Sequence, residues 1–177
     1  MLLILFYKEG TMLKKRIEAA SVAFRNPEII EIRDPLTGAM TRKEFLRIAG
    51  KILNRAERDN QIVSLAMLDM DGLKLINDTR GHRAGDMAIK EFAQAIFANI
   101  RPLDICARWH SDAGDEFILL LLDVNLIASM SIIQRIQEVF PKFSWGMAGS
   151  RFDHEYGLES MIELVEERMY RDKKSKK

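Results

Sequence analysis

The sequence predicts an α/β sandwich, in which helices pack on a central β-sheet that is mixed or mostly antiparallel. Stretches with apolar residues at helical spacing alternate with short runs that are almost entirely apolar, and such runs are typical of buried strands. Two of these runs, residues 104–109 and 116–122, are separated by six residues, which predicts a hairpin of antiparallel strands. A chain of 177 residues has room for one such domain and a short extra element.

The composition is that of a globular protein without a strong charge bias. The formal net charge is +1, with 47% hydrophobic and 30% charged residues, so the chain can bury a core. The basic run at residues 173–177 is interpreted as a solvated chain end, and we expect no nucleic-acid partner. Cys106 is the single cysteine, which excludes an internal disulfide and favours a cytoplasmic location.

Residues 1–33 are predicted to be a helical lead-in or stalk. Their first residues include about six consecutive apolar ones, whereas a membrane span needs roughly 20. They are either a helix start or the remnant of a longer protein with an upstream sensor or membrane segment. Residues 12–24 carry an apolar stripe that predicts a helix, which either packs on the domain or pairs with its copy in a second chain. Turn-forming residues 34–38 then begin the main domain, residues 34–177.

The main domain starts with a helix, which Thr41 and Glu44 open as a capping box. The apolar side of this helix consists of Phe45, Ile48, Ala49, Ile52 and Ala56. A strand follows and ends at Asp69. The next amphipathic helix has an apolar side formed by Ile89, Phe92, Ala93, Ile96 and Ile100.

Three further elements follow the hairpin. A helix is indicated by apolar residues at helical spacing, namely Leu126, Met130, Ile133 and Phe140. Residues 143–149 are predicted to be a strand. Ser160 and Glu163 are interpreted as a second capping box, which opens a last helix. Its inner side is formed by Met161, Leu164, Val165 and Met169.

Four carboxylates stand at the ends of two predicted strands. Asp69 and Asp71 close the first strand and, two residues apart on an extended backbone, share a face. Asp115 and Glu116 open the second strand of the hairpin. Such carboxylates suit Mg²⁺, which takes one or two protein carboxylates and leaves other positions for phosphate oxygens.

The segment after Asp71 favours phosphate binding. Gly72 lets the backbone approach a ligand closely, and the helix start that follows offers free N–H groups to an anion. A site for a metal and a phosphate is one interpretation, and the other is that the carboxylates only keep the strand ends hydrated. An EF-hand loop from Asp69 is excluded, because Lys74 and Arg80 occupy the positions of its glycine and glutamate.

Four segments of the chain, in order, resemble one protein family. They are DPLTGAMTR (34–42), LDMDGLKLINDTRGHRAGD (68–86), AGDEF (113–117) and ERMYRDKK (167–174). The chain is thereby similar to the GGDEF domains, diguanylate cyclases that condense two GTP molecules into cyclic di-GMP. The resemblance covers about residues 34–177 and implies the palm-like, ferredoxin-like core of that family.

The resemblance implies roles for individual residues. Asp69, the backbone of Met70 and Asp115 would hold Mg²⁺ or Mn²⁺ on the GTP phosphates. Glu116, the second catalytic candidate beside Asp115, would assist deprotonation of the attacking 3′ hydroxyl. Asn77 and Asp86 would read guanine, whose two N–H donors a carboxylate can accept. The remaining substrate-binding residues would be Gly72, Leu73, Lys74 and Lys173. Of these, Lys173 would reach the terminal phosphates.

The resemblance also implies partners. The reaction needs two GTP molecules face to face and one domain holds one, so we expect a homodimer, with residues 12–24 as a stalk. Arg101 and Asp104 resemble the family's R-x-x-D inhibitory site, where the product cyclic di-GMP binds back. The other interpretation of Arg101 and Asp104 is a surface ion pair.

The chain departs from the family pattern at three points. His110, Ser111 and Asp112 lengthen the hairpin loop before AGDEF by three residues, and Ala113 replaces the first glycine of the motif. The last basic residue of the pattern falls on Lys177, with no strand after it. Two functions therefore remain open, an active diguanylate cyclase and a catalytically degenerate module that binds GTP or cyclic di-GMP as a signalling domain.

Overall fold

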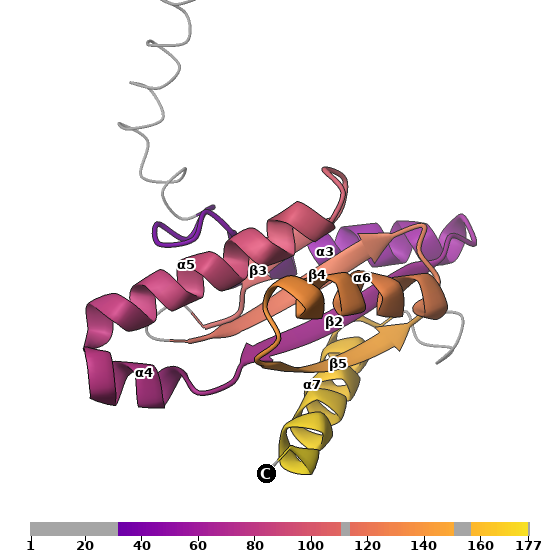
Figure 1. The fold of residues 1–177 in the computed structure, drawn as a ribbon. Coiled ribbons are helices and arrows are strands. Elements are labelled where there is room, and N and C mark those ends of the chain that lie inside the picture. Colours follow the sequence, from indigo (N-terminus) through magenta and orange to yellow (C-terminus); the bar gives the residue numbers. More distant parts are fainter. Residues whose placement is uncertain (1–31, 111–113, 151–156, 177) are drawn as a thin grey trace, which may run out of the picture.

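The structure, a computed structural model, describes residues 32–110, 114–150 and 157–176 (Figure 1). The helix predicted at residues 12–24 lies outside this part, as does Lys177. The elements in chain order are β1 (Met40–Thr41), α3 (Arg42–Arg58), β2 (Val63–Met70), α4 (Leu73–Arg80), α5 (His82–Asn99), β3 (Ile105–Arg108), β4 (Glu116–Leu122), α6 (Leu126–Val139), β5 (Phe143–Gly149) and α7 (Leu158–Ser175).

The sheet has five strands in the order β1-β3-β4-β2-β5. β1 runs parallel to β3, while the pairs β3–β4, β4–β2 and β2–β5 are antiparallel. The predicted hairpin is therefore present as β3 and β4, and the mixed, mostly antiparallel sheet is confirmed. β1 was not predicted, because a two-residue strand shows no alternation in sequence.

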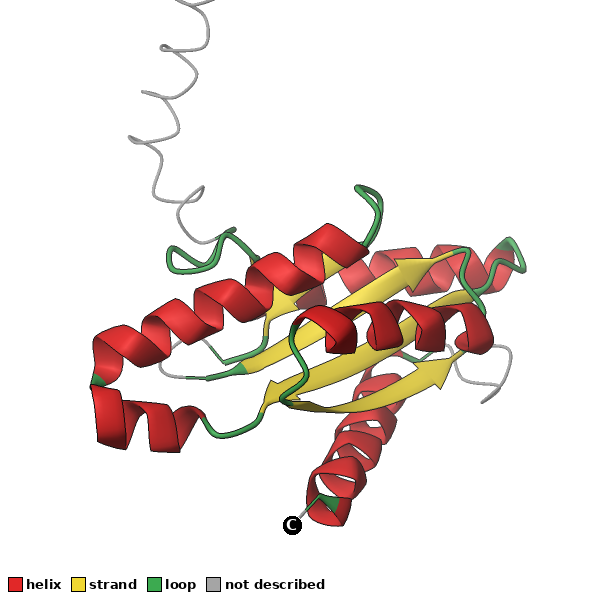
Figure 2. Cartoon of the chain, viewed as in Figure 1, coloured by secondary structure: helices red, strands yellow, loops and turns green. Residues whose placement is uncertain are grey.

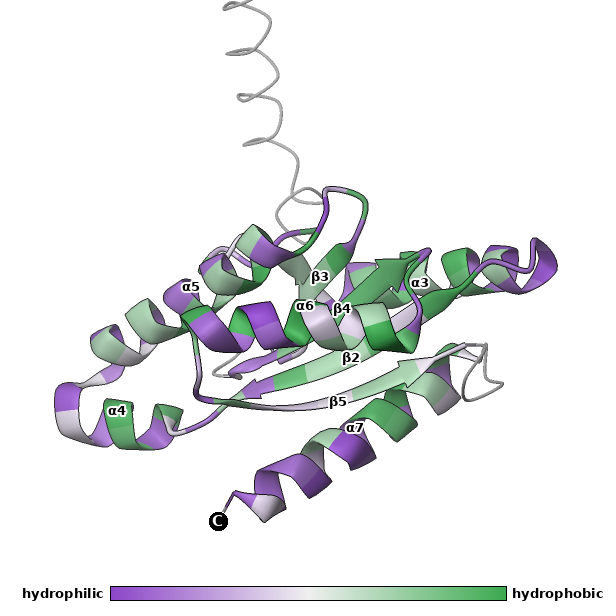
Figure 3. Ribbon diagram, turned by 45° about the vertical axis from the view of Figure 1, so that its right-hand side comes forward, coloured by the Kyte–Doolittle hydropathy of each residue, from purple (hydrophilic) through white to green (hydrophobic). Residues whose placement is uncertain are grey.

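Helices cover both faces of the sheet (Figure 2). Side chains of α5 and α6 form one core cluster with Ala66, Leu68 and Met70, and those of α3 and α7 form the other with Leu65 and Met67. Alternate residues of β2 thus enter opposite cores, which explains why the whole strand is buried. Hydrophobic residues concentrate along the central strands in Figure 3, whereas the C-terminal end of α7 is hydrophilic.

Two helix details differ from the sequence prediction. The prediction of a capping box at Ser160 is wrong. α7 begins at Leu158 after the N-cap Gly157, because Leu158 packs against the core beneath α3 and α7. Met130, one of the apolar residues whose spacing indicated the helix α6, is exposed, because the buried side of α6 is centred on Ile133 and its neighbours. At α3, by contrast, Thr41 caps the helix as predicted, with its Oγ1 accepting the N–H of Glu44 at 3.5 Å.

α4 and α5 form a helical hairpin that extends past the end of the sheet (Figure 1). Gly81 ends α4 and precedes α5 with φ of 81°, a backbone conformation that L side chains rarely adopt. The hairpin brings residues of α4 and α5 side by side close to the end of β2. None of the described helices is both long enough and apolar enough to span a bilayer.

Candidate functional site

The predicted carboxylates meet at one end of the sheet. Asp69 at the end of β2 lies opposite Glu116 at the start of β4, and the Met70 N–H donates to the Asp115 carbonyl oxygen at 3.2 Å. Asp71 lies just past the strand, where its Oδ1 accepts the Ser144 hydroxyl of β5 at 2.9 Å. Three strands therefore contribute to a single acidic site.

Lys173 of α7 reaches this acidic site. Its Nζ lies 2.6 Å from Asp69 Oδ1. The helix can come this close because of Gly146 on β5, where a Cβ atom would stand 2.1 Å from the Val165 carbonyl oxygen and 2.3 Å from the Met169 nitrogen. The glycine permits contact between helix and strand backbones, and this contact places Lys173 beside the carboxylates.

Burial and mutual repulsion make the carboxylates reluctant to ionise. Burial raises the pKa of Asp115 to about 6, and the charge of Asp69 adds to the shift. Burial likewise raises the pKa of Asp69, against the opposing effect of its hydrogen bond from Lys173. For Lys173, burial alone lowers the pKa, but the hydrogen bond to Asp69 and the surrounding carboxylates raise it overall. Additional positive charge at this site would stabilise the ionised carboxylates.

The donor set fits Mg²⁺ or Mn²⁺. Over the described ranges no three His, Cys, Asp or Glu side chains form a cluster that could hold a metal ion by themselves. Asp69 and Asp115, with the backbone of Met70, supply two carboxylates and a carbonyl group. Mg²⁺ is typically held by one or two carboxylates and completes its shell with water and phosphate oxygens, so the site suits a metal that arrives with a phosphate ligand.

The turn between β2 and α4 exposes backbone donors. Gly72 precedes the helix with φ of 86° and forms no side-chain cap. The N–H groups of Leu73 and Lys74 are in the first helical turn, where the helix itself offers no acceptor. The Leu73 side chain is buried in the core and Lys74 is exposed, so Leu73 can contribute to the site only through its backbone. An anion fits at this helix end.

Asn77 of α4 lies against Gly85 of α5, the residue directly before Asp86. Asn77 Oδ1 is buried and has no hydrogen-bond partner within residues 32–110, 114–150 and 157–176, and Asp86 is exposed. A Cβ at Gly85 would stand 2.0 Å from Asn77 Oδ1, so only glycine leaves room for the amide in this position. The sequence analysis missed Gly85, although a glycine inside a helix directly before Asp86 was a usable signal.

A buried ion pair supports the loop before Asp115. Arg108 at the end of β3 is 4% exposed, and its Nη1 donates to both carboxylate oxygens of Asp34 at 3.2 and 3.1 Å. Its Nε donates to the Gly114 carbonyl oxygen at 3.0 Å. Asp34 also accepts the N–H and hydroxyl of Thr37. The turn at residues 34–38, predicted only as a boundary, thus fixes the backbone next to Asp115.

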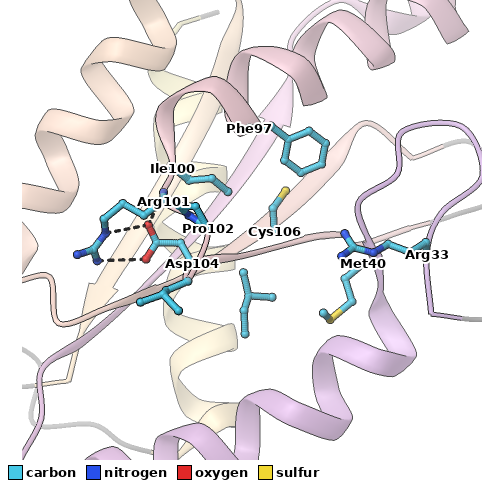
Figure 4. Close-up of a pocket in the computed structure, with 10 residues that line it drawn as sticks. Arg33, Met40, Phe97, Ile100, Arg101, Pro102, Asp104 and Cys106 are labelled. Atoms are coloured by element: carbon cyan, nitrogen blue, oxygen red, sulfur yellow. Dashed lines mark hydrogen bonds and ion pairs between the residues drawn. The ribbon is translucent and has the colours of Figure 1, made fainter. Parts of the chain in front are cut away.

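Arg101 and Asp104 come together at the other end of the hairpin (Figure 4). Asp104 Oδ2 accepts the Arg101 backbone N–H at 2.8 Å and its Nε at 3.3 Å, while Oδ1 accepts the Leu122 N–H at 3.2 Å. The two residues line a cavity of about 360 Å³, together with Arg33 and Cys106. The Asp104 side chain is fully buried, whereas that of Arg101 is 53% exposed.

The fold and the acidic site define an α/β domain suited to metal-bound phosphates. Residues 31–177 match the family described as "Diguanylate cyclase, GGDEF domain". The chain therefore belongs to the GGDEF domain family, as its motifs predict, and the predicted fold class is confirmed.

Curated relatives are similar over most of this chain. Diguanylate cyclase A of Treponema denticola is 26% identical over 185 residues, which cover 94% of this chain and 49% of the relative. The probable diguanylate cyclase DgcJ of Escherichia coli is 31% identical, over 86% of this chain and 32% of its own length. The chain spans about half or less of the length of these relatives.

Solved structures share the fold. Diguanylate cyclase SiaD of Pseudomonas aeruginosa, solved in complex with its activator SiaC, has a TM-score of 0.73 and 27% identity over 98% of this chain and 74% of its own. The GGDEF domain of DgcB from Caulobacter crescentus, solved in complex with c-di-GMP, has a TM-score of 0.74 and 25% identity over 81% of this chain and 91% of its own.

Proposed function

We propose that this chain is a diguanylate cyclase, which condenses two GTP molecules into cyclic di-GMP with release of pyrophosphate. The observation that carries the proposal is the meeting of Asp69, Asp115, Glu116 and Lys173 at one end of the sheet. The names of the curated relatives support it.

The acidic site would hold the triphosphate. Asp69, Asp115 and the backbone of Met70 bind Mg²⁺ or Mn²⁺, which neutralises phosphate charge and polarises the phosphorus centre when bound. The N–H groups after Gly72, at Leu73 and Lys74, donate to phosphate oxygens. Lys173, already beside Asp69, contributes a point charge to the terminal phosphates.

The α4–α5 hairpin would select guanine. The Asp86 carboxylate accepts the N1–H and N2–H donors of guanine, a pair that adenine lacks. Asn77 contributes a second hydrogen bond from the facing helix, through the amide whose Oδ1 has no partner among the described residues. A base that cannot satisfy these groups leaves buried polar atoms unpaired, which costs affinity.

Glu116 would accept the proton of the attacking hydroxyl. The 3′ oxygen of one GTP forms a bond to the α-phosphorus of the other, the bond to pyrophosphate breaks, and the hydroxyl proton passes to Glu116. A second step of the same kind closes the ring: the two nucleotides exchange roles, the other 3′ oxygen bonds to the remaining α-phosphorus, and a second pyrophosphate leaves. The chain binds one GTP at its acidic site, so the reaction requires a homodimer. Residues 1–33 serve as the lead-in or stalk of this dimer. Residues 34–177 carry out catalysis in the cytoplasm.

Arg101 and Asp104 would form a product site that restrains the enzyme. The half-exposed Arg101 guanidinium is available to a phosphate of cyclic di-GMP, and the buried Asp104 orients it. The structure of DgcB in complex with c-di-GMP supports a product-binding role for this family.

The second candidate is a GGDEF-like module that binds GTP or cyclic di-GMP without turnover. The loop before Asp115, which is three residues longer than in the family pattern, favours it, because a small displacement of Asp115 or Glu116 can cost about a hundredfold in rate. Purified protein incubated with GTP and Mg²⁺ separates the two. A cyclase forms pyrophosphate and cyclic di-GMP, and the Asp69→Asn variant forms neither. Asp59→Asn, an exposed position at the end of α3, is the matched control and retains activity.

A further inference from the structure

His110 contacts the side chain of Glu116. The imidazole Nδ1 forms a hydrogen bond with Glu116 Oε2, and His110 belongs to the loop residues that are extra to the family pattern. We propose that His110 is a positioning residue, which holds the Glu116 carboxylate in the orientation that accepts the hydroxyl proton. The proposal rests on the proposed cyclase function and adds a residue to its site.

The backbone that carries His110 is held by its neighbour Trp109. The Trp109 N–H donates to the Glu116 carbonyl oxygen at 2.8 Å, and its indole, 3% exposed, donates to Glu166 Oε1 at 3.1 Å. The Phe45 ring packs edge-on against it, and the Arg42 guanidinium lies 4.3 Å from the ring centroid. These contacts fix the backbone from which the His110 side chain extends.

Gly114 lies directly against His110. A Cβ at Gly114 would stand 2.4 Å from the His110 Cβ and 2.5 Å from its carbonyl oxygen. The Gly114 carbonyl oxygen is held in turn by Arg108. His110 and the segment Gly114–Glu116 are therefore adjacent, although three residues lie between His110 and Gly114 in the sequence.

The contact restricts a side chain that otherwise has considerable freedom. Glu116 is 24% exposed, and its flexible side chain loses rotamer freedom when one oxygen is fixed. With Oε2 bound to His110, Oε1 is left to accept a proton from the substrate. Small displacements of a reacting group can cost about a hundredfold in rate, so fixing this carboxylate matters for turnover and not for GTP binding.

The kinetic test compares His110→Ala with His110→Asn. The alanine variant is expected to lose about tenfold or more in kcat, with KM for GTP changed less than about twofold. The asparagine variant is expected to recover most of the rate, because its amide nitrogen reaches the position of Nδ1. Unchanged or faster turnover in His110→Ala overturns the proposal, and so does an asparagine variant as slow as the alanine variant.

Proton-detected NMR of the imidazole nitrogens gives a readout that does not need turnover. The chain has three histidines, and the spectrum of His110→Ala identifies the signals of His110. In the wild type we expect the His110 imidazole to carry a proton on Nδ1. In Glu116→Ala we expect the tautomer with the proton on Nε2. A wild-type His110 protonated only on Nε2 overturns the positioning role. Absence of product from the wild type instead overturns the cyclase function, and the NMR result then still decides the contact.

Discussion

Lys173 lies 2.6 Å from Asp69, although 104 residues separate them in the sequence. The lysine is near the C-terminal end of α7 and the aspartate at the end of β2. The pair brings a positive charge to a site where four carboxylates meet, and it depends on the close packing of α7 against β5.

Gly146→Ala is expected to separate α7 from β5. The added methyl group would overlap backbone atoms of α7, which cannot move independently of the helix, so we expect a loss of about 1–3 kcal/mol in the free energy of unfolding and weaker GTP binding. Urea denaturation and calorimetry measure the two effects. Gly50→Ala in α3 is the control, because its Cβ would meet Leu158 at an ordinary 3.9 Å. Equal stability of both variants would contradict the account of α7.

Gly85→Ala is expected to weaken the selection of guanine. Its Cβ would displace the Asn77 amide, which lies 2.0 Å from that position, without touching the carboxylates. We expect the affinity for GTP to fall towards that for ATP, while Mg²⁺ binding is unchanged. Competition binding with the two nucleotides measures this ratio. A GTP preference equal to that of the wild type would exclude Asn77 as a guanine contact.

The stability of the metal-free protein is expected to fall as pH rises from about 4 to about 6. Burial raises the Asp115 pKa to about 6, above its value of about 3.9 in an unfolded chain, so over this range the folded state binds more protons. Asp115→Asn removes the cost of ionising this buried carboxyl group. With chelator present, the melting temperature of this variant should therefore exceed that of the wild type at pH 7.5 and match it near pH 4. Asp59→Asn, where Arg55 and Arg58 lower the pKa, should not raise it. A lower melting temperature for Asp115→Asn at pH 7.5 contradicts this assignment.

Arg108→Ala is expected to cost about 3–5 kcal/mol, because it leaves the Asp34 carboxylate buried without its partner. Asp34→Ala with Arg108→Ala should cost less than the sum of the two single variants, since both remove the same contact. Urea denaturation of the three variants measures the coupling. If the two costs are additive, Asp34 and Arg108 are not coupled, and the ion pair does not stabilise the backbone next to Asp115.

Arg101→Ala is expected to lower the affinity for cyclic di-GMP by removing the exposed guanidinium at the cavity, while the rate at low product stays at the wild-type value. Arg47→Ala is the matched control, because Arg47 is an exposed arginine of α3 that also pairs with a carboxylate, Glu44, and does not line the cavity. Calorimetry with cyclic di-GMP measures the change. If Arg101→Ala binds as tightly as the wild type, the pair with Asp104 is only structural.

The elements with strong periodicity could be predicted from the sequence, and so could the acidic site. The β2 run, the hairpin and the helix stripes depend on local patterns, and the resemblance to GGDEF domains supplied the roles that we propose for Asp69 and Asp115. The start of α7 could not be predicted, because Leu158 joins the helix through a tertiary contact with the core. The tertiary contacts at Gly85 and Gly146 also leave no periodic signal, since a glycine reveals close packing only when its neighbour is known.

The contacts that fix the loop before Asp115 were beyond sequence reasoning for a related reason. Asp34 and Arg108 are 74 residues apart, and their pairing depends on how the N-terminal turn sits against β3. His110 was identified only as part of an insertion, and its contact with Glu116 and the close approach of Gly114 to it are tertiary contacts that no sequence pattern indicates.

Chromatographic analysis of the wild-type protein with GTP and Mg²⁺ tests the central claim most directly. The account predicts cyclic di-GMP and pyrophosphate, with a rate per protomer that rises with protein concentration and vanishes in the presence of EDTA. GTP that remains intact at high protein concentration would contradict the claim that the residues gathered around Asp69 and Asp115 form a working cyclase site.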